Sequence, residues 1–232
     1  MNSTMKIALI NPPSSCVNED RVESPLGLLY IASTVREEGY RNISICDMSG
    51  SRSDLEITER MRDIPPAEVY GLTSFCTNYQ YAKEVIKNIR AINRLAYIVL
   101  GGPNASGVPE FSFNDSGADA VVVGEGEDIF KSCLDSYVSN SRLTGIHKGV
   151  GRNNIDSYAF PARDLVDLAT YSRELMGNKV ISLLSSRGCQ HHCAHCNSVV
   201  MGGGNKTVRY RSSDNIVKEI EMIRGSHKYF RF

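Results

Sequence analysis

Short apolar runs alternate with segments of helical periodicity over the first 140 residues of the chain. The runs predict buried strands at residues 7–10, 43–45, 69–75, 97–100 and 120–123. The segments between them predict helices, because apolar residues recur there at every third or fourth position. Five strands interleaved with helices indicate an α/β domain with a doubly wound, Rossmann-like or flavodoxin-like parallel sheet. Such a sheet binds its ligand at the carboxyl ends of its strands.

The periodicity weakens after residue 144, so we expect the first domain to cover residues 1–144. Residues 145–178 are rich in glycine and are predicted to be a linker. Residues 179–232 contain a predicted strand at 180–184, a loop with three cysteines, a helix starting near Ser213 or Asp214, and a last strand at 229–232. A strand, a loop and a helix cannot close a core, so we expect this part to be the incomplete start of a second domain.

Charge and hydropathy exclude several classes of partner. The chain carries 26 basic and 26 acidic residues, which gives no excess of positive charge for binding nucleic acid. No apolar run approaches the ~20 residues that span a bilayer, and the N-terminal residues show no signal-peptide pattern. We therefore expect a cytoplasmic protein with neither a nucleic-acid nor a membrane partner.

Three of the seven cysteines lie close together in the sequence, while Cys16 and the other three are isolated. Cys189, Cys193 and Cys196 have the spacing C-x3-C-x2-C. Three thiolates in one loop can hold three irons of a [4Fe-4S] cluster and leave the fourth iron open. Zinc is an alternative, with a histidine as fourth ligand, and three free thiols are another. The candidate histidines are His191, His192, His195 and His227.

Glycines and small polar residues follow the predicted strands at the edge where a doubly wound fold binds its ligand. A glycine lets a bulky ligand approach the backbone closely, although tight turn geometry explains each glycine pair taken alone. The nucleotide-binding patterns G-x-G-x-x-G and G-x4-G-K-[ST] are both missing. The candidate binding residues are Thr73, Ser74, Asn78, Gly101, Gly102, Pro103, Gly124, Glu125 and Gly126.

The cysteine loop resembles the signature of radical S-adenosylmethionine enzymes, and the first domain resembles the cobalamin-binding domain that precedes many of them. The shared markers are a proline pair after the first strand, P-L-G-L at residues 25–28, G-G-P at 101–103, G-E-G-E at 124–127, and a bridging P-A-R-D-L at 161–165. Asn104 departs from the pattern, because the family usually has a histidine there. A cobalt-binding D-x-H-x-x-G motif is also missing from residues 11–16.

The resemblance implies a fold, a set of cofactors and a reaction. Cys189, Cys193 and Cys196 would hold a [4Fe-4S] cluster whose open iron binds S-adenosylmethionine, in a partial TIM barrel that begins at residues 180–184. Asn197 stands where the backbone of many members meets the adenine. Cobalamin would bind the first domain without a histidine on cobalt.

The implied reaction is methyl transfer to an unactivated centre of a small-molecule substrate, started by a 5'-deoxyadenosyl radical. The electron would come from an external donor such as a flavodoxin or ferredoxin. We expect the chain to be truncated early in the barrel. Two other interpretations stay open: a cobalamin-binding module with an inert barrel remnant, and a zinc-stabilised α/β regulator.

Overall fold

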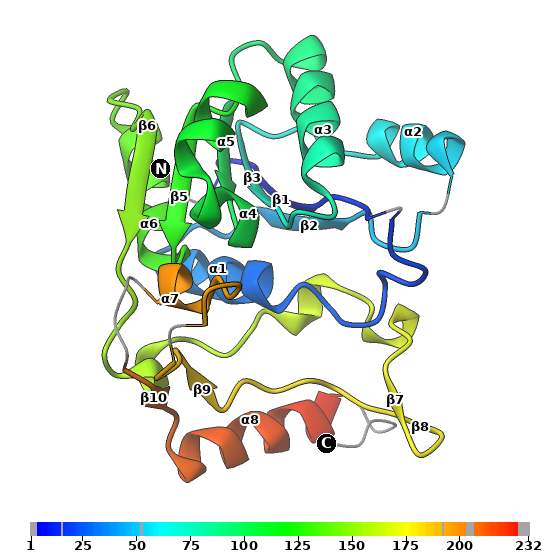
Figure 1. Ribbon diagram of the computed structural model, residues 1–232, viewed down its shortest axis with the longest axis vertical. Helices are drawn as coiled ribbons and strands as arrows, with labels where there is room; N and C mark the ends of the chain where they lie inside the picture. The colour runs from blue at the N-terminus through cyan, green and yellow to red at the C-terminus, as the bar shows by residue number, and fades with distance from the viewer. Residues whose placement is uncertain (1–3, 15, 52, 192, 203–206, 227–232) are drawn as a thin grey trace.

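The computed structural model describes residues 4–14, 16–51, 53–191, 193–202 and 207–226. The strand predicted at 229–232 and two of the candidate zinc ligands, His192 and His227, lie outside the described residues. A parallel sheet in the order β2-β1-β3-β4-β5-β6 forms the centre (Figure 1). Its strands are β1 (Ile7–Asn11), β2 (Ile43–Asp47), β3 (Val69–Thr73), β4 (Tyr97–Gly101), β5 (Ala120–Gly124) and β6 (Gly145–Gly149).

The doubly wound fold is confirmed, but the sheet has six strands where the sequence predicted five. The additional strand is β6, which lies in the segment assigned to the linker. This strand contains exposed Ile146 and Lys148 and has no buried apolar run. An edge strand hydrogen-bonds to a neighbour on one side, so it forms without the apolar pattern that marks a central strand.

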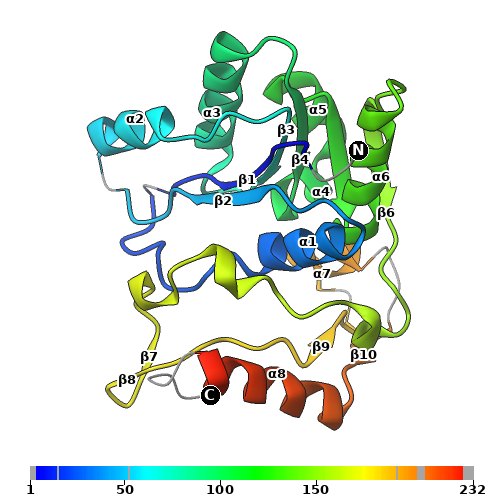
Figure 2. The ribbon, with the colours of Figure 1, turned by 180° about the vertical axis from the view of Figure 1, so that it is seen from behind.

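Helices cover both faces of the sheet, as the alternation of side chains along each strand requires. In β1, Ile7 and Leu9 face one cluster of buried side chains, and Ala8 and Ile10 face the other. The first cluster is completed by α1 (Leu26–Glu37) and α6 (Glu127–Val138). The second is completed by α2 (Asp54–Arg62), α3 (Tyr79–Ile92), α4 (Pro103–Gly107) and α5 (Pro109–Ser116). Figure 2 shows α1 on the side of the sheet opposite α2 and α3.

After β6 the chain crosses beneath α1 and forms a second layer (Figure 1). This layer begins with three short 3-10 helices, at Ile155–Ser157, Arg163–Leu165 and Leu168–Thr170. It continues with the hairpin of β7 (Glu174–Leu175) and β8 (Asn178–Lys179), then β9 (Ser186–Arg187), α7 (Ser198–Met201), β10 (Arg209–Tyr210) and α8 (Ser213–Ser226). The predicted helix start at Ser213 is confirmed.

The strand predicted at residues 180–184 is wrong, because residues 181–184 form no strand. This segment runs alongside α8 (Figure 1). Its side chains Ile181 and Leu183 pack in one cluster with Ile223 of α8. The apolar run therefore reflects burial against a helix, which periodicity cannot distinguish from burial in a sheet. Within the described residues, no helix is long and apolar enough to cross a membrane.

Candidate cofactor site

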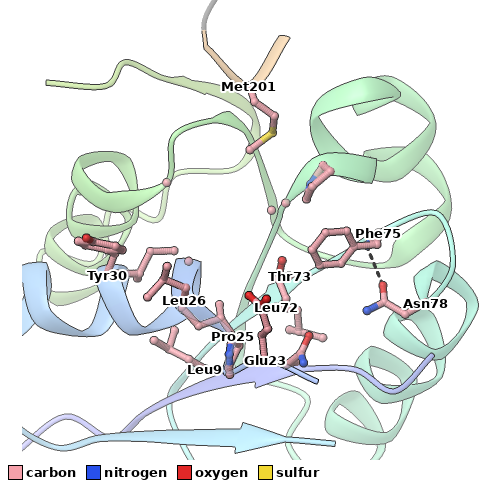
Figure 3. Close-up of a pocket in the computed structure, with 18 of the residues that line it drawn as sticks. Leu9, Glu23, Pro25, Leu26, Tyr30, Leu72, Thr73, Phe75, Asn78 and Met201 are labelled. Atoms are coloured by element: carbon pink, nitrogen blue, oxygen red, sulfur yellow. Dashed lines mark hydrogen bonds between the residues drawn. The ribbon is translucent and has the colours of Figure 1, made fainter. Parts of the chain in front are cut away.

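A cavity of about 1170 Å³ lies at the carboxyl ends of the central strands. Sites for ordinary small ligands measure ~300–1,000 Å³, so this cavity is large enough for a bulkier molecule. Apolar side chains from the sheet and from α1 form much of its wall, and Figure 3 shows Leu9, Leu26 and Leu72 around it. The position agrees with the rule that a doubly wound sheet binds ligands at this edge.

Eight of the nine binding residues predicted from the sequence line this cavity. They are Thr73, Asn78, Gly101, Gly102, Pro103, Gly124, Glu125 and Gly126. The ninth residue, Ser74, is fully buried, and its hydroxyl donates a hydrogen bond to the carbonyl oxygen of Gly101 at 3.1 Å. Ser74 thus joins β3 to β4 behind the cavity wall. Contact of the other eight with a ligand stays a prediction.

The side chain of Asn78 holds the wall of the cavity together. Its Oδ1 accepts a hydrogen bond from the backbone N–H of Phe75 at 2.7 Å, drawn as a dashed line in Figure 3. Its Nδ2 donates to the carbonyl oxygen of Pro12 at 3.1 Å. Because Asn78 is 3% exposed and bonded at both ends, its observed role is to join the loops after β1 and β3.

The glycines around the cavity differ in what a side chain at each position would contact. Gly102 has a φ of +93°, and a Cβ there would lie 2.6 Å from Oγ1 of Thr73 and 2.7 Å from the backbone nitrogen of Ser74. The fold itself therefore requires glycine at position 102. A Cβ on Gly27 of α1 would meet no atom within 4 Å, and the nearest atoms at Gly101 lie at 3.8 Å. These two positions leave open space along the wall.

Glu125 lines the cavity, but its carboxylate is engaged by arginines. Its Oε2 lies 2.9 Å from Nη1 of Arg187, and the same nitrogen lies 2.6 Å from Oε1 of Glu127. Arg209 also pairs with Glu125. Burial opposes the charge on Arg187, but Glu127 and Glu125 outweigh it and raise the pKa of the guanidinium above its ordinary value.

Sequence reasoning missed Arg187 and Glu127 as residues of this site. Both line the cavity. Two signals pointed to them: Arg187 stands two residues before the first cysteine of the C-x3-C-x2-C motif, and Glu127 is the second acid of G-E-G-E. A pairing between residues 60 positions apart cannot be read from either motif alone.

The three predicted cluster ligands lie in a loop next to the cavity. Cys189 is partly exposed, and Cys193 and Cys196 are exposed. Among the residues that the structure describes, no group of three or more His, Cys, Asp or Glu side chains converges as a metal site. The thiols thus share a loop but not a common centre. Ser198, hydrogen-bonded to Sγ of Cys196 at 3.1 Å, holds the pKa of that thiol below its ordinary value.

The loop that carries the cysteines is flanked on both sides by residues that line the cavity. Arg187 and Gly188 precede it, and Asn197 and Met201 follow it. Figure 3 shows the side chain of Met201 directed toward the cavity from the side opposite the sheet. The side-chain amide of Asn197 donates a hydrogen bond to the carbonyl oxygen of Pro103. The cysteine loop and the strand-end loops therefore border the same space.

Comparison with known proteins supports the first domain's resemblance. Residues 20–134 match the family model described as the B12 binding domain. The chain is 31% identical over 240 residues to an uncharacterized methyltransferase, PH0819, of Pyrococcus horikoshii, and the match covers 94% of this chain and 50% of that protein. The chain thus spans about half the length of this relative.

Two solved structures have the same fold. One is the radical S-adenosylmethionine methyltransferase TsrM from Kitasatospora setae, with a TM-score of 0.66 and 21% identity, covering 96% of this chain and 46% of TsrM. The other is the cobalamin-dependent S-adenosylmethionine radical enzyme OxsB, with a TM-score of 0.69 and 18% identity, covering 98% of this chain and 32% of OxsB. The two structures thus share the α/β fold of this chain, and the match to the B12 binding domain model covers residues 20–134.

Proposed function

We propose that this chain is the cofactor-binding part of a cobalamin-dependent radical S-adenosylmethionine enzyme that transfers a methyl group to a small molecule. One observation carries the proposal. The cavity at the carboxyl edge of the sheet, in the part of the chain that matches the B12 binding domain model, is bordered by the ends of the segment that holds Cys189, Cys193 and Cys196. A cobalamin site and a cluster site would then face one reaction space.

The residues around the cavity fit a corrin ring. Gly27 and Gly101 carry no side chain and each leaves open space at the wall, so a corrin could approach the backbone there. The apolar wall formed by Leu9 and Leu72 would exclude water, and the hydroxyl of Thr73 would offer a hydrogen bond to a polar edge of the ligand. These residues would bind and orient the cofactor.

The donor set of the cysteine loop fits an iron–sulfur cluster by its chemistry, since thiolates are the ligands that such clusters need. Cys189, Cys193 and Cys196 would hold the cluster, and an external flavodoxin or ferredoxin would reduce it. When bound, cobalamin carries the methyl group and the cluster activates S-adenosylmethionine. The protein supplies position and shelter for that chemistry.

The names of the similar proteins support this class of reaction. PH0819 is called a methyltransferase, TsrM was solved with tryptophan as substrate, and OxsB with aqua-cobalamin and S-adenosylmethionine. For this chain we propose methyl transfer and a small-molecule substrate.

A second candidate is a cobalamin-binding module whose cysteine segment holds no cluster. The observation that favours it is that the three cysteines do not converge as a metal site within the described residues. In this case the chain would bind cobalamin without cleaving S-adenosylmethionine.

Elemental analysis separates the two candidates. The chain is incubated anaerobically with hydroxocobalamin, iron and sulfide, desalted, and analysed for cobalt, iron and zinc. The proposal predicts about one cobalt and about four iron atoms per chain. Cobalt without iron would favour the binding module. Zinc with neither of the other metals would contradict both candidates.

A further inference from the structure

Two arginines from the second layer meet two carboxylates, one from the loop after β5 and one from the first residue of α6. Arg187 of β9 pairs with Glu125 at 2.9 Å and with Glu127 at 2.6 Å. Arg209, from the paired strand β10, binds Glu125 and donates to the carbonyl oxygen of Arg152 at 2.7 Å. The side chains are 6–14% exposed, so the four charges form a nearly buried and neutral cluster.

Two aromatic rings enclose this cluster. The guanidinium carbon of Arg187 lies 4.8 Å from the ring centre of Tyr30 and 4.6 Å from that of Tyr158. The hydroxyl of Tyr158 donates to Oε2 of Glu125 at 3.3 Å, and burial raises the pKa of this phenol to about 12. Stacking of a guanidinium on an aromatic ring adds to the charge attraction. The Arg187 guanidinium is therefore held by two rings and by the two carboxylates.

The backbone around Arg187 gives little support of its own. The pair of β9 and β10 contains two residues on each side, and an isolated two-stranded ladder is marginal in water. After the cysteines, the side chain of Asn197 donates a hydrogen bond to the carbonyl oxygen of Pro103 in the sheet domain. This contact holds the second end of the segment, as Arg187 holds the first. The cysteine segment is therefore fixed to the strand-end loops at both of its ends.

We propose that Glu125 and Glu127 are positioning residues, which hold Arg187 and thereby keep the cysteine segment, residues 188–197, beside the cavity that its ends Gly188 and Asn197 line. Their carboxylate oxygens already accept from Arg187, Arg209 and Tyr158, so the corrin is not needed to satisfy them. That this positioning sets the distance between two cofactors rests on the proposed function. The positioning of the segment by Glu125 and Glu127 does not depend on it.

Hydrogen–deuterium exchange of the cofactor-free chain tests the proposal. Glu127→Gln keeps the shape of the side chain but leaves a buried cationic excess, which is costly. We expect amides in residues 188–202 to exchange about tenfold faster or more in this variant, with exchange in the sheet unchanged. Glu110→Gln, an exposed acid on α5, is the matched control and should exchange like the natural chain.

A double-variant comparison shows whether Glu127 acts through Arg187. Once Arg187→Gln has removed the partner, adding Glu127→Gln should change the exchange of residues 188–202 by less than about twofold. Equal effects of Glu127→Gln with and without Arg187 would overturn the proposal. So would unchanged exchange in this segment for both single variants.

A third variant keeps all four charged residues but disturbs their packing. A Cβ on Gly151 would lie 2.3 Å from Oε2 of Glu125 and 2.4 Å from Nη1 of Arg209, so Gly151→Ala should displace these groups and loosen the same segment. This measurement remains decisive if the glutamine variants unfold, and unchanged exchange in folded Gly151→Ala would contradict the proposal. A failure of the proposed function would appear separately, as absent cobalt or iron binding by the natural chain.

Discussion

The sheet domain and the layer beneath it are stabilised in different ways. The sheet has an extended cluster of buried apolar side chains on each face. In the second layer the largest buried cluster of the described residues has four members, Leu168, Tyr171, Ile181 and Ile223. Since apolar burial is the dominant source of stability, the sheet can fold by its own core, whereas the second layer depends on polar contacts and on docking.

The clearest of these polar contacts is a buried triad. Glu219 of α8 is fully buried and lies 3.0 Å from Nη2 of Arg163 and 2.5 Å from Nη1 of Arg211. Arg163 belongs to the chain that crosses beneath α1, so the triad joins α8 to that segment. One wall of the cavity thus belongs to the sheet with its apolar core, and the other is held by ion pairs such as those of Arg187.

The largest effect that we predict is a loss of iron binding in the second layer without a loss of cobalt binding in the sheet domain. Cys193→Ala should abolish iron binding after reconstitution while cobalt binding by the sheet domain persists, because a cluster needs all three thiolates. Cys76→Ala, which removes an exposed thiol outside the motif, is the control and should retain about four iron atoms per chain. Iron content that survives in Cys193→Ala would refute the assignment of the cluster ligands.

A smaller effect is a loss of hydrogen-exchange protection that we expect in the second layer alone. Glu219→Gln leaves Arg163 and Arg211 buried without a counter-charge, and breaking a buried pair in this way costs about 3–5 kcal/mol. We expect the amides of α8 to lose protection in hydrogen exchange while those of the sheet keep theirs. Glu221→Gln changes an exposed acid on the same helix and should have no such effect. Loss of protection throughout the sheet would show that the two regions are not separable.

The smallest effect is a change in stability at the loops after β3 and β4, which form the sheet side of the cavity. Gly102→Ala places a Cβ against Thr73 and the backbone of Ser74 at a positive φ, so it should lower the free energy of unfolding by about 1–3 kcal/mol. Gly27→Ala meets no atom within 4 Å and lies in a helix, so stability should be unchanged or slightly raised. Chemical denaturation of both variants measures the difference. Equal stabilities would mean that the loops after β3 and β4 move apart easily.

The contrast also explains which parts of the structure the sequence could predict. Strands such as β4 have apolar residues that must be buried on both faces, and this requirement is visible in the chain. The edge strand β6 and the segment at 181–184 were misread because their partners are set by tertiary contacts. Likewise, most strand-end residues were found from local patterns, whereas the pairing of Glu127 with Arg187 depends on how two distant segments dock.

We propose that one space holds both the cobalamin site and the cluster site. Electron paramagnetic resonance tests it most directly, on a reconstituted sample that contains both cob(II)alamin and the reduced cluster. We expect each signal to be broadened or split by the other, relative to samples that hold one paramagnetic centre alone. Two unperturbed signals in a sample with full cobalt and iron content would contradict it.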